Sequence, residues 1–174
     1  MITLCCTQKI RKRLKLAATP PGSSPPTTAL GDWYVNLVQF GRQQVVMATS
    51  ERSLLTVLLP ARDLRESLVP NLQWAVQQLL TVFGIPPEAV SREIAEMEPI
   101  AFASAVNRRV LGSMNEFAWQ AGAYLDRTDD ALELARRLSE TPMSAVGFKS
   151  RLGIPAEMAR ELLVAHYAAS PFRH

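Results

Sequence analysis

The densest cluster of reactive side chains in this sequence is a run of positive charge near its start. Five bases and no acid lie within the first 20 positions, whereas the whole chain has 19 Lys and Arg against 16 Asp and Glu. The remainder therefore carries 14 bases and 16 acids, and the net charge of +3 comes from this run. Clustered cations can bind phosphates, an acidic protein face or anionic lipid, although a solvated helix face is the plainer interpretation. The predicted binding residues of the run are Lys9, Arg11, Lys12, Arg13 and Lys15.

A second candidate binding segment lies at residues 30–36, where a turn-forming Gly-Asp pair precedes two aromatic residues. Trp33 and Tyr34 are neighbours in a predicted strand, so their rings should point to opposite faces of the sheet. One ring can enter the core while the other faces a partner, with Asp32 beside them. The alternative is that Asp32 bonds the local backbone and that one ring covers a sheet edge.

A third candidate segment is the start of a predicted helix at residue 107. Asn107 can cap this helix. Arg108 and Arg109 occupy its first turn, where the helix dipole disfavours positive charge, so we expect them to meet an acidic segment or an anionic ligand. Asn115 is expected to be half-buried and hydrogen-bonded, and Gly112 to allow close helix–sheet contact.

Carboxylates and arginines elsewhere in the sequence leave open an enzyme without a histidine base. A carboxylate base with an arginine clamp could work between the predicted sheet and the helix at 107–125. This alternative requires at least three of its polar side chains to share one cleft. Its candidate residues are Asp32, Arg42, Glu51, Arg52, Arg109, Asn115 and Glu116.

Several classes of site have no signature in the sequence. It contains no phosphate-binding glycine loop, no GxSxG elbow, no HExxH and no EF-hand loop. The adjacent Cys5 and Cys6 cannot join distant parts of the chain, and with only His166 and His174 they lack metal-ligand spacing. We therefore predict no catalytic residue, no metal and no cofactor. Unpaired cysteines and the absence of an apolar run of membrane-spanning length favour a cytoplasmic protein.

Hydrophobic alternation predicts a sheet built largely from the first third of the chain. Aromatic and β-branched residues dominate three segments that short turns separate, which is typical of an antiparallel meander. Apolar side chains on both faces of the second and third segments indicate that both sides of the sheet are covered. The predicted strands are 1–6, 33–40, 44–48, 54–59 and 99–103.

Helical spacing of apolar residues predicts helices in the rest of the chain. Proline is expected to begin a long helix at Pro70, because the first helical position needs no amide donor. The predicted helices are 8–16, with Thr7 as its cap, a short turn at 63–68, a longer helix from 70, then 88–96, 107–125, 129–140 and 155–168.

The proline-rich stretch 17–29 divides the chain into three parts. Four prolines there disfavour helix and predict an extended surface linker or a mobile loop. We expect a basic strand–helix piece at 1–16, the linker at 17–29 and a globular body at 30–174, although the first strand can still pair with the main sheet. Strands that come before helices predict the α+β class: an antiparallel β-meander packed against several α-helices in a single domain.

Four strings in the chain resemble the landmark stretches of a bacterial domain family that carries only an unknown-function label. They are LGDWYVNL at 30–37, ERSLLTVLLPARD at 51–63, NRRVLGSMNEFA at 107–118 and LSETP at 138–142, and CTQK at 6–9 resembles the family's opening. The resemblance covers most of the chain and matches the linker and the last helix least. It supports the fold boundaries and implies no catalytic residue.

Three hypotheses on function follow from these residues. The favoured one is a non-catalytic binding module that contacts a protein or nucleic-acid partner through the basic N-terminal arm. It predicts that removal of residues 1–18, or neutralisation of Arg11, Lys12 and Arg13, weakens binding in a strongly salt-dependent way. The small enzyme described above is the second, and an oligomer formed through an exposed sheet edge is the third.

Overall fold

A five-stranded mixed sheet runs through the centre of the computed structural model, which describes residues 1–124, 130–144 and 153–168. Its strand order is β4-β3-β2-β1-β5. The three strands β2, β3 and β4 form an antiparallel meander, as predicted, while β1 is parallel to both of its neighbours. The strands are β1 (Ile2–Cys6), β2 (Trp33–Phe40), β3 (Gln43–Ser50), β4 (Thr56–Pro60) and β5 (Ile100–Ser104).

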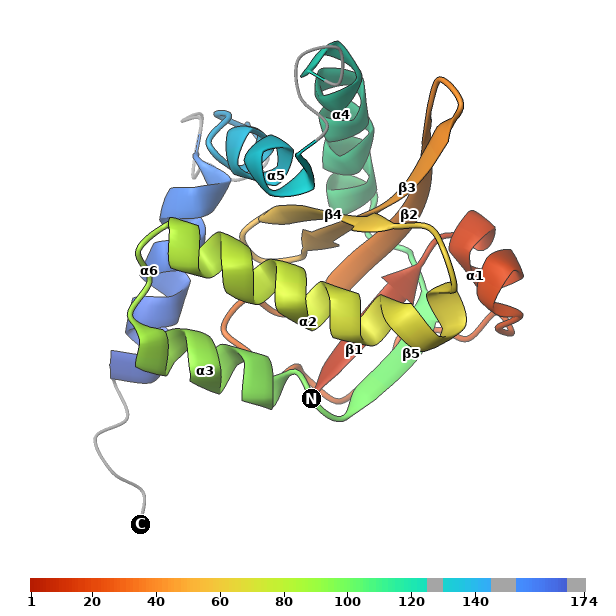
Figure 1. Cartoon of the computed structure of the whole chain (residues 1–174). Helices are drawn as coiled ribbons and strands as arrows, with labels where there is room; N and C mark the ends of the chain where they lie inside the picture. Colours follow the sequence, from red (N-terminus) through yellow and green to blue (C-terminus); the bar gives the residue numbers. More distant parts are fainter. Residues whose placement is uncertain (125–129, 145–152, 169–174) are drawn as a thin grey trace.

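Helices cover both faces of this sheet, which confirms the α+β class and the single domain (Figure 1). One face packs mainly against α1 (Gln8–Leu14), α2 (Leu64–Val82), α3 (Pro87–Glu96) and α6 (Pro155–Ala168). The other face packs mainly against α4 (Arg108–Tyr124) and α5 (Ala131–Ser139). Alternation along β2 places the Trp33 ring in the first layer and the Tyr34 ring in the second.

The prediction that a new helix begins at Pro70 is wrong. Residues 64–82 form one continuous helix with Pro70 inside it. Leu64, Leu68 and Leu72 recur every fourth residue and are all buried, so the same apolar stripe extends across the proline. Burial of each such side chain contributes about 1.5–3 kcal/mol. Together these leucines outweigh the roughly 3 kcal/mol that an interior proline costs.

The segment between α1 and β2 lies on the surface and is anchored at both ends. Residues 17–25 are exposed. The Ser104 N–H donates to the Thr19 carbonyl over 2.7 Å, and the Thr27 N–H donates to the Met1 carbonyl over 3.0 Å. Both ends of the proline-rich segment are therefore hydrogen-bonded to the β1–β5 half of the sheet. Within the described residues, no helix is both long and apolar enough to span a membrane.

Candidate functional site

Helix α1 presents the predicted cations from a fixed position on the sheet. Ile10 and Leu14 lie one turn apart and are buried against the first helical layer. Their burial turns the opposite side of the helix to solvent, where four of the five cations are exposed and Arg11 is half-buried. Thr7 occupies the cap position, but its hydroxyl donates to Asn36 Oδ1 over 2.9 Å instead of capping α1. We call Lys9, Lys12, Arg13 and Lys15 the α1 basic face.

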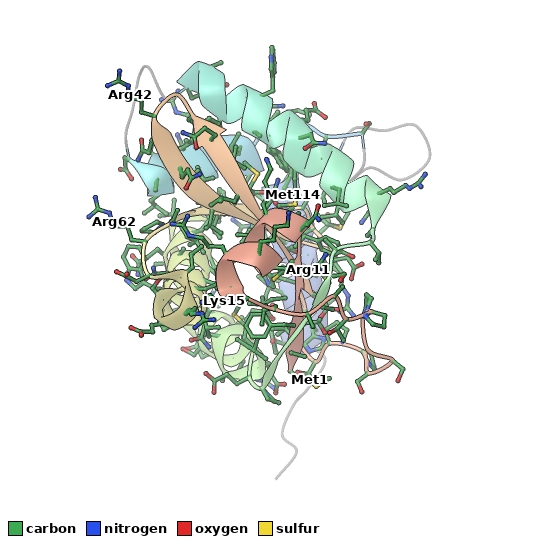
Figure 2. All side chains as sticks on the ribbon, turned by 90° about the vertical axis from the view of Figure 1, so that its right-hand side faces the viewer. Met1, Arg11, Lys15, Arg42, Arg62 and Met114 are labelled. Atoms are coloured by element: carbon green, nitrogen blue, oxygen red, sulfur yellow. The ribbon has the colours of Figure 1, made fainter. Side chains whose placement is uncertain are left out.

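A groove beside α1 continues this positive surface with arginines from two other elements. It has a volume of about 740 Å³ and is lined by Arg13 of α1, Arg42 of the β2–β3 turn and Arg62 after β4. In Figure 2, Arg42 and Arg62 extend outward on the same side of the molecule. Its other lining residues are Gln43, Gln44, Val45, Leu58, Leu59, Pro60, Ala61 and Ala131. We call this site the arginine groove.

Positive charge predominates among the described residues that line the arginine groove. None of its described lining residues is acidic. Three ion pairs at α5 and its C-cap join Arg136 to Glu133 and Glu140, and Arg137 to Glu133, and none of the three involves a groove arginine. Acidic side chains do occur next to it, because Asp63 and Glu66 line a smaller hollow with Arg13 and Arg65.

A polar cluster on the other side of the sheet gathers several residues of the enzyme alternative. The Thr3 N–H donates to the Asp32 carboxylate over 2.7 Å, and the Asn107 amide donates to Glu51 Oε1 over 3.1 Å. The Arg109 side chain donates to the Glu51 backbone carbonyl over 2.8 Å. Asn107 also caps α4 as predicted, since its Oδ1 accepts from the Arg109 N–H. These bonds hold the start of α4 against the sheet.

Burial shifts the titration of the groups in this cluster. It raises the pKa of Asp32, and the nearby Glu51 acts in the same direction, against the Thr3 N–H that favours the carboxylate. Burial likewise raises the pKa of the Cys5 thiol to about 12 and the pKa of the Tyr34 hydroxyl above its usual range. At neutral pH the thiol and the phenol are both uncharged and poor nucleophiles.

Three of the remaining residues of the enzyme alternative lie outside this cluster, whereas Arg52 lies close enough to act electrostatically on the Asp32 carboxylate. Arg42 stands at the tip of the β2–β3 hairpin and lines the arginine groove. Asn115 and Glu116 are exposed on α4. Arg52 is exposed and donates to the backbone carbonyls of Thr28 and Ala29. Hydrogen bonds therefore link Asp32, Glu51 and Arg109 to one another or to neighbouring backbone groups. These bonds fix the local structure and indicate a structural role for the three residues.

Three expectations about exposure are corrected by the structure. Trp33 and Tyr34 are 0% and 2% exposed, so neither ring faces a partner, because helices cover both faces of β2. Asn115 is exposed and not half-buried. Gly112 has no neighbouring atom within 4 Å of where a Cβ would stand, so it does not mark a close helix–sheet contact. Arg108 is exposed at the start of α4.

Sequence reasoning missed part of the arginine groove. Arg62, Gln43 and Gln44 were not among the candidates, and Arg42 was placed in the enzyme alternative only. The available signal was the polar end of each strand of the meander, since Gln43 begins β3 and Arg62 follows the end of β4. The antiparallel turn brings these ends together, and the packing of α1 adds Arg13 to them. Across the described ranges, no three His, Cys, Asp or Glu residues form a cluster that could hold a metal.

Comparison with known proteins gives a family but no activity. A family model described as Domain of unknown function (DUF6933) matches residues 3–158, which is most of the chain, and the chain belongs to this family. The resemblance found in the sequence to a domain family of unknown function is thereby confirmed. No curated protein gives a significant match, and no solved structure does.

Proposed function

We propose that this DUF6933 domain is a non-catalytic binding module that holds a polyanionic partner, an acidic protein or a nucleic acid, on its α1 basic face. The observation that carries the proposal is the set of exposed cations on one side of a helix whose other side is locked into the core. We also propose a cytoplasmic location, since both cysteines are free and buried.

A cationic helix with a fixed backbone loses less conformational entropy on binding than a flexible arm does. The chain has already fixed the backbone of α1 by burying Ile10 and Leu14, so binding orders only the ends of the lysine and arginine side chains. Unpaired cations also need not break an existing ion pair before they meet a new anion. The expected consequences are fast, electrostatically steered association and strong dependence on salt.

The enzyme alternative has one observation in its favour, the raised pKa of Asp32. The Asp32 carboxylate already accepts a hydrogen bond from the Thr3 N–H. The backbone carbonyl of Asp32 accepts a second one from the Glu51 N–H over 2.8 Å. A general base must reach a substrate proton. The bonds around Asp32 instead tie strands together, and this favours a structural role.

The test uses the full chain and two fluorescent polyanions, a single-stranded oligonucleotide and an acidic peptide. Binding is measured by anisotropy between about 50 mM and about 200 mM salt, over which a protein with several phosphate contacts loses orders of magnitude in affinity. We expect the variant Lys9→Gln/Lys12→Gln/Lys15→Gln to weaken binding by at least about tenfold at low salt and to flatten the salt dependence.

A control variant with the same loss of net charge separates local contacts from overall charge. Gln77→Glu, Ser91→Glu and Ala123→Glu together also lower the net charge by three, at exposed positions on other helices. This control should keep most of the affinity. Absence of binding to both probes at low salt, or equal losses in the two variants, would refute the proposal.

A further inference from the structure

We infer that the arginine groove takes a protein segment that carries both carboxylates and aliphatic side chains, in preference to a nucleic acid. This inference rests on the proposed function and names its partner class. The observation behind it is the juxtaposition of three arginines from separate elements over a floor of aliphatic residues.

The arginines supply the recognition of carboxylates. Arg13, Arg42 and Arg62 come from α1, from the β2–β3 turn and from the segment after β4, so they surround the hollow from different directions. Each guanidinium can donate two parallel hydrogen bonds to one carboxylate. Gln43 and Gln44 add amide donors and acceptors, which suit the backbone of a peptide.

The floor of the groove supplies apolar contact that a phosphate backbone cannot use. The aliphatic lining residues are Val45, Leu58, Leu59, Pro60, Ala61 and Ala131; Leu58 and Leu59 are buried, so the accessible apolar surface comes mainly from the other four. A polyanion with only polar groups would leave this surface wet, whereas aliphatic side chains of a partner would gain free energy by covering it. The floor therefore distinguishes an acidic peptide with aliphatic residues from a uniformly polar polyanion.

The lining residues also lack what single-stranded nucleic acid binding commonly uses. Bases stack on aromatic rings in such sites, and none of the described residues that line the groove is aromatic. A volume of about 740 Å³ is of the size that holds a few side chains of a peptide. Charge alone admits both partners, and the shape and the floor favour the peptide.

The experiment compares four labelled probes on the full chain by anisotropy. They are a short peptide of alternating Asp and Leu, a peptide of alternating Asp and Ser with the same length and charge, a single-stranded oligonucleotide and a short duplex. We expect the Asp-Leu peptide to bind at least about tenfold more tightly than each of the other three.

Two variants that lower the net charge by the same amount test whether the peptide binds in the groove. Arg42→Gln/Arg62→Gln removes two groove arginines, both exposed, and should weaken the Asp-Leu peptide by at least about tenfold. Ser91→Glu/Ala123→Glu also lowers the net charge by two, at exposed positions on α3 and α4 that do not line the groove, and should cost less than about threefold in affinity. Thermal unfolding followed by circular dichroism verifies that both variants are folded.

The outcomes separate the inference from the proposed function. Equal affinity for the Asp-Leu and Asp-Ser peptides, tighter binding of either nucleic acid, or equal losses in the two variants would each overturn the inference and leave the proposed function standing. Failure of all four probes to bind would remove both.

Discussion

Glu93 shows how one side chain can join three parts of this molecule. It is 1% exposed, and its carboxylate accepts hydrogen bonds from the Ala29 and Leu30 N–H groups over 2.8 and 3.0 Å and from the Tyr167 hydroxyl over 2.6 Å. The bonds connect α3 with the residues that lead into β2 and with α6. A buried carboxylate is tolerated only with such partners. The same hydrogen bond raises the pKa of Tyr167, after burial as the larger cause.

Substitution of Glu93 should therefore cost more than the loss of one bond. Glu93→Ala leaves two backbone donors and one hydroxyl buried without a partner, and we expect it to lower the free energy of unfolding by about 3–5 kcal/mol in urea titrations. Tyr167→Phe removes a single donor and should cost about 1–2 kcal/mol. Similar losses in the two variants would mean that the backbone donors find other partners.

The two cysteines should make the fold sensitive to alkali. Burial raises the pKa of both the Cys5 and the Cys6 thiol to about 12. In the unfolded chain a thiol ionises near pH 8.5. Between these values the folded state binds more protons than the unfolded state, so stability falls as pH rises through that window and is unaffected by the thiols below it.

The expected slope is about 1.4 kcal/mol per pH unit for each thiol once the pH exceeds 8.5, measured by urea unfolding at a series of pH values. The variant Cys5→Ala/Cys6→Ala should show a shallower fall. Neither native thiol should react with a thiol reagent near pH 8, and both should react in denaturant. Rapid labelling of the folded protein would contradict the burial of these side chains.

At the scale of elements, the strands were more predictable than the way they join. Alternation in residues 33–40 and aliphatic runs at 44–48 and 54–59 predict the meander. A strand that is buried on both faces needs a short and nearly continuous apolar run, and such a run can be recognised in the sequence. The parallel pairing of β1 with β2 and β5 depends on contacts between residues far apart in the chain, such as Leu4 with Trp33 and Leu4 with Phe102. Local periodicity carries no information on these partners.

The two parts of the candidate site also differ in how far the sequence predicts them. The α1 basic face follows from helical spacing, since burial of Ile10 and Leu14 decides which side of α1 faces water. The arginine groove does not follow from spacing, because Arg13, Arg42 and Arg62 meet only after the meander has formed and α1 has docked. Exposure of Trp33 and Tyr34 was overestimated, since coverage of both sheet faces comes from helices much later in the chain.

Gly112 provides a test of how α4 is stabilised. It lies in the second turn of the helix, is exposed and has open space where a Cβ would stand. Gly112→Ala should raise the free energy of unfolding by about 0.5–1 kcal/mol, because alanine loses less backbone entropy in a helix. Thermal and urea unfolding measure the gain. Destabilisation would show that another molecule or segment packs against this position.

At the scale of the whole molecule, the basic piece is inseparable from the body. β1 lies between β2 and β5 in the sheet and is parallel to both of them. The segment 1–16 supplies five buried side chains to the main core, Ile2, Leu4, Cys6, Ile10 and Leu14. The basic helix is consequently held by the strand that precedes it, whatever the proline-rich segment does.

Deletion of residues 1–16 should for this reason abolish folding and not merely binding. Burial of Ile2, Leu4, Ile10 and Leu14 contributes about 1.5–3 kcal/mol each, a sum comparable with the entire stability of about 5–15 kcal/mol that is usual for a domain. Loss of β1 would also open a gap between β2 and β5 and expose two strand edges. The truncated chain is expected to show no cooperative unfolding transition by circular dichroism, whereas the Lys9→Gln/Lys12→Gln/Lys15→Gln variant keeps one. A truncated chain with a native-like transition would mean that β5 can pair directly with β2. In that case, weaker binding after removal of residues 1–18 would report the contribution of the α1 basic face to affinity.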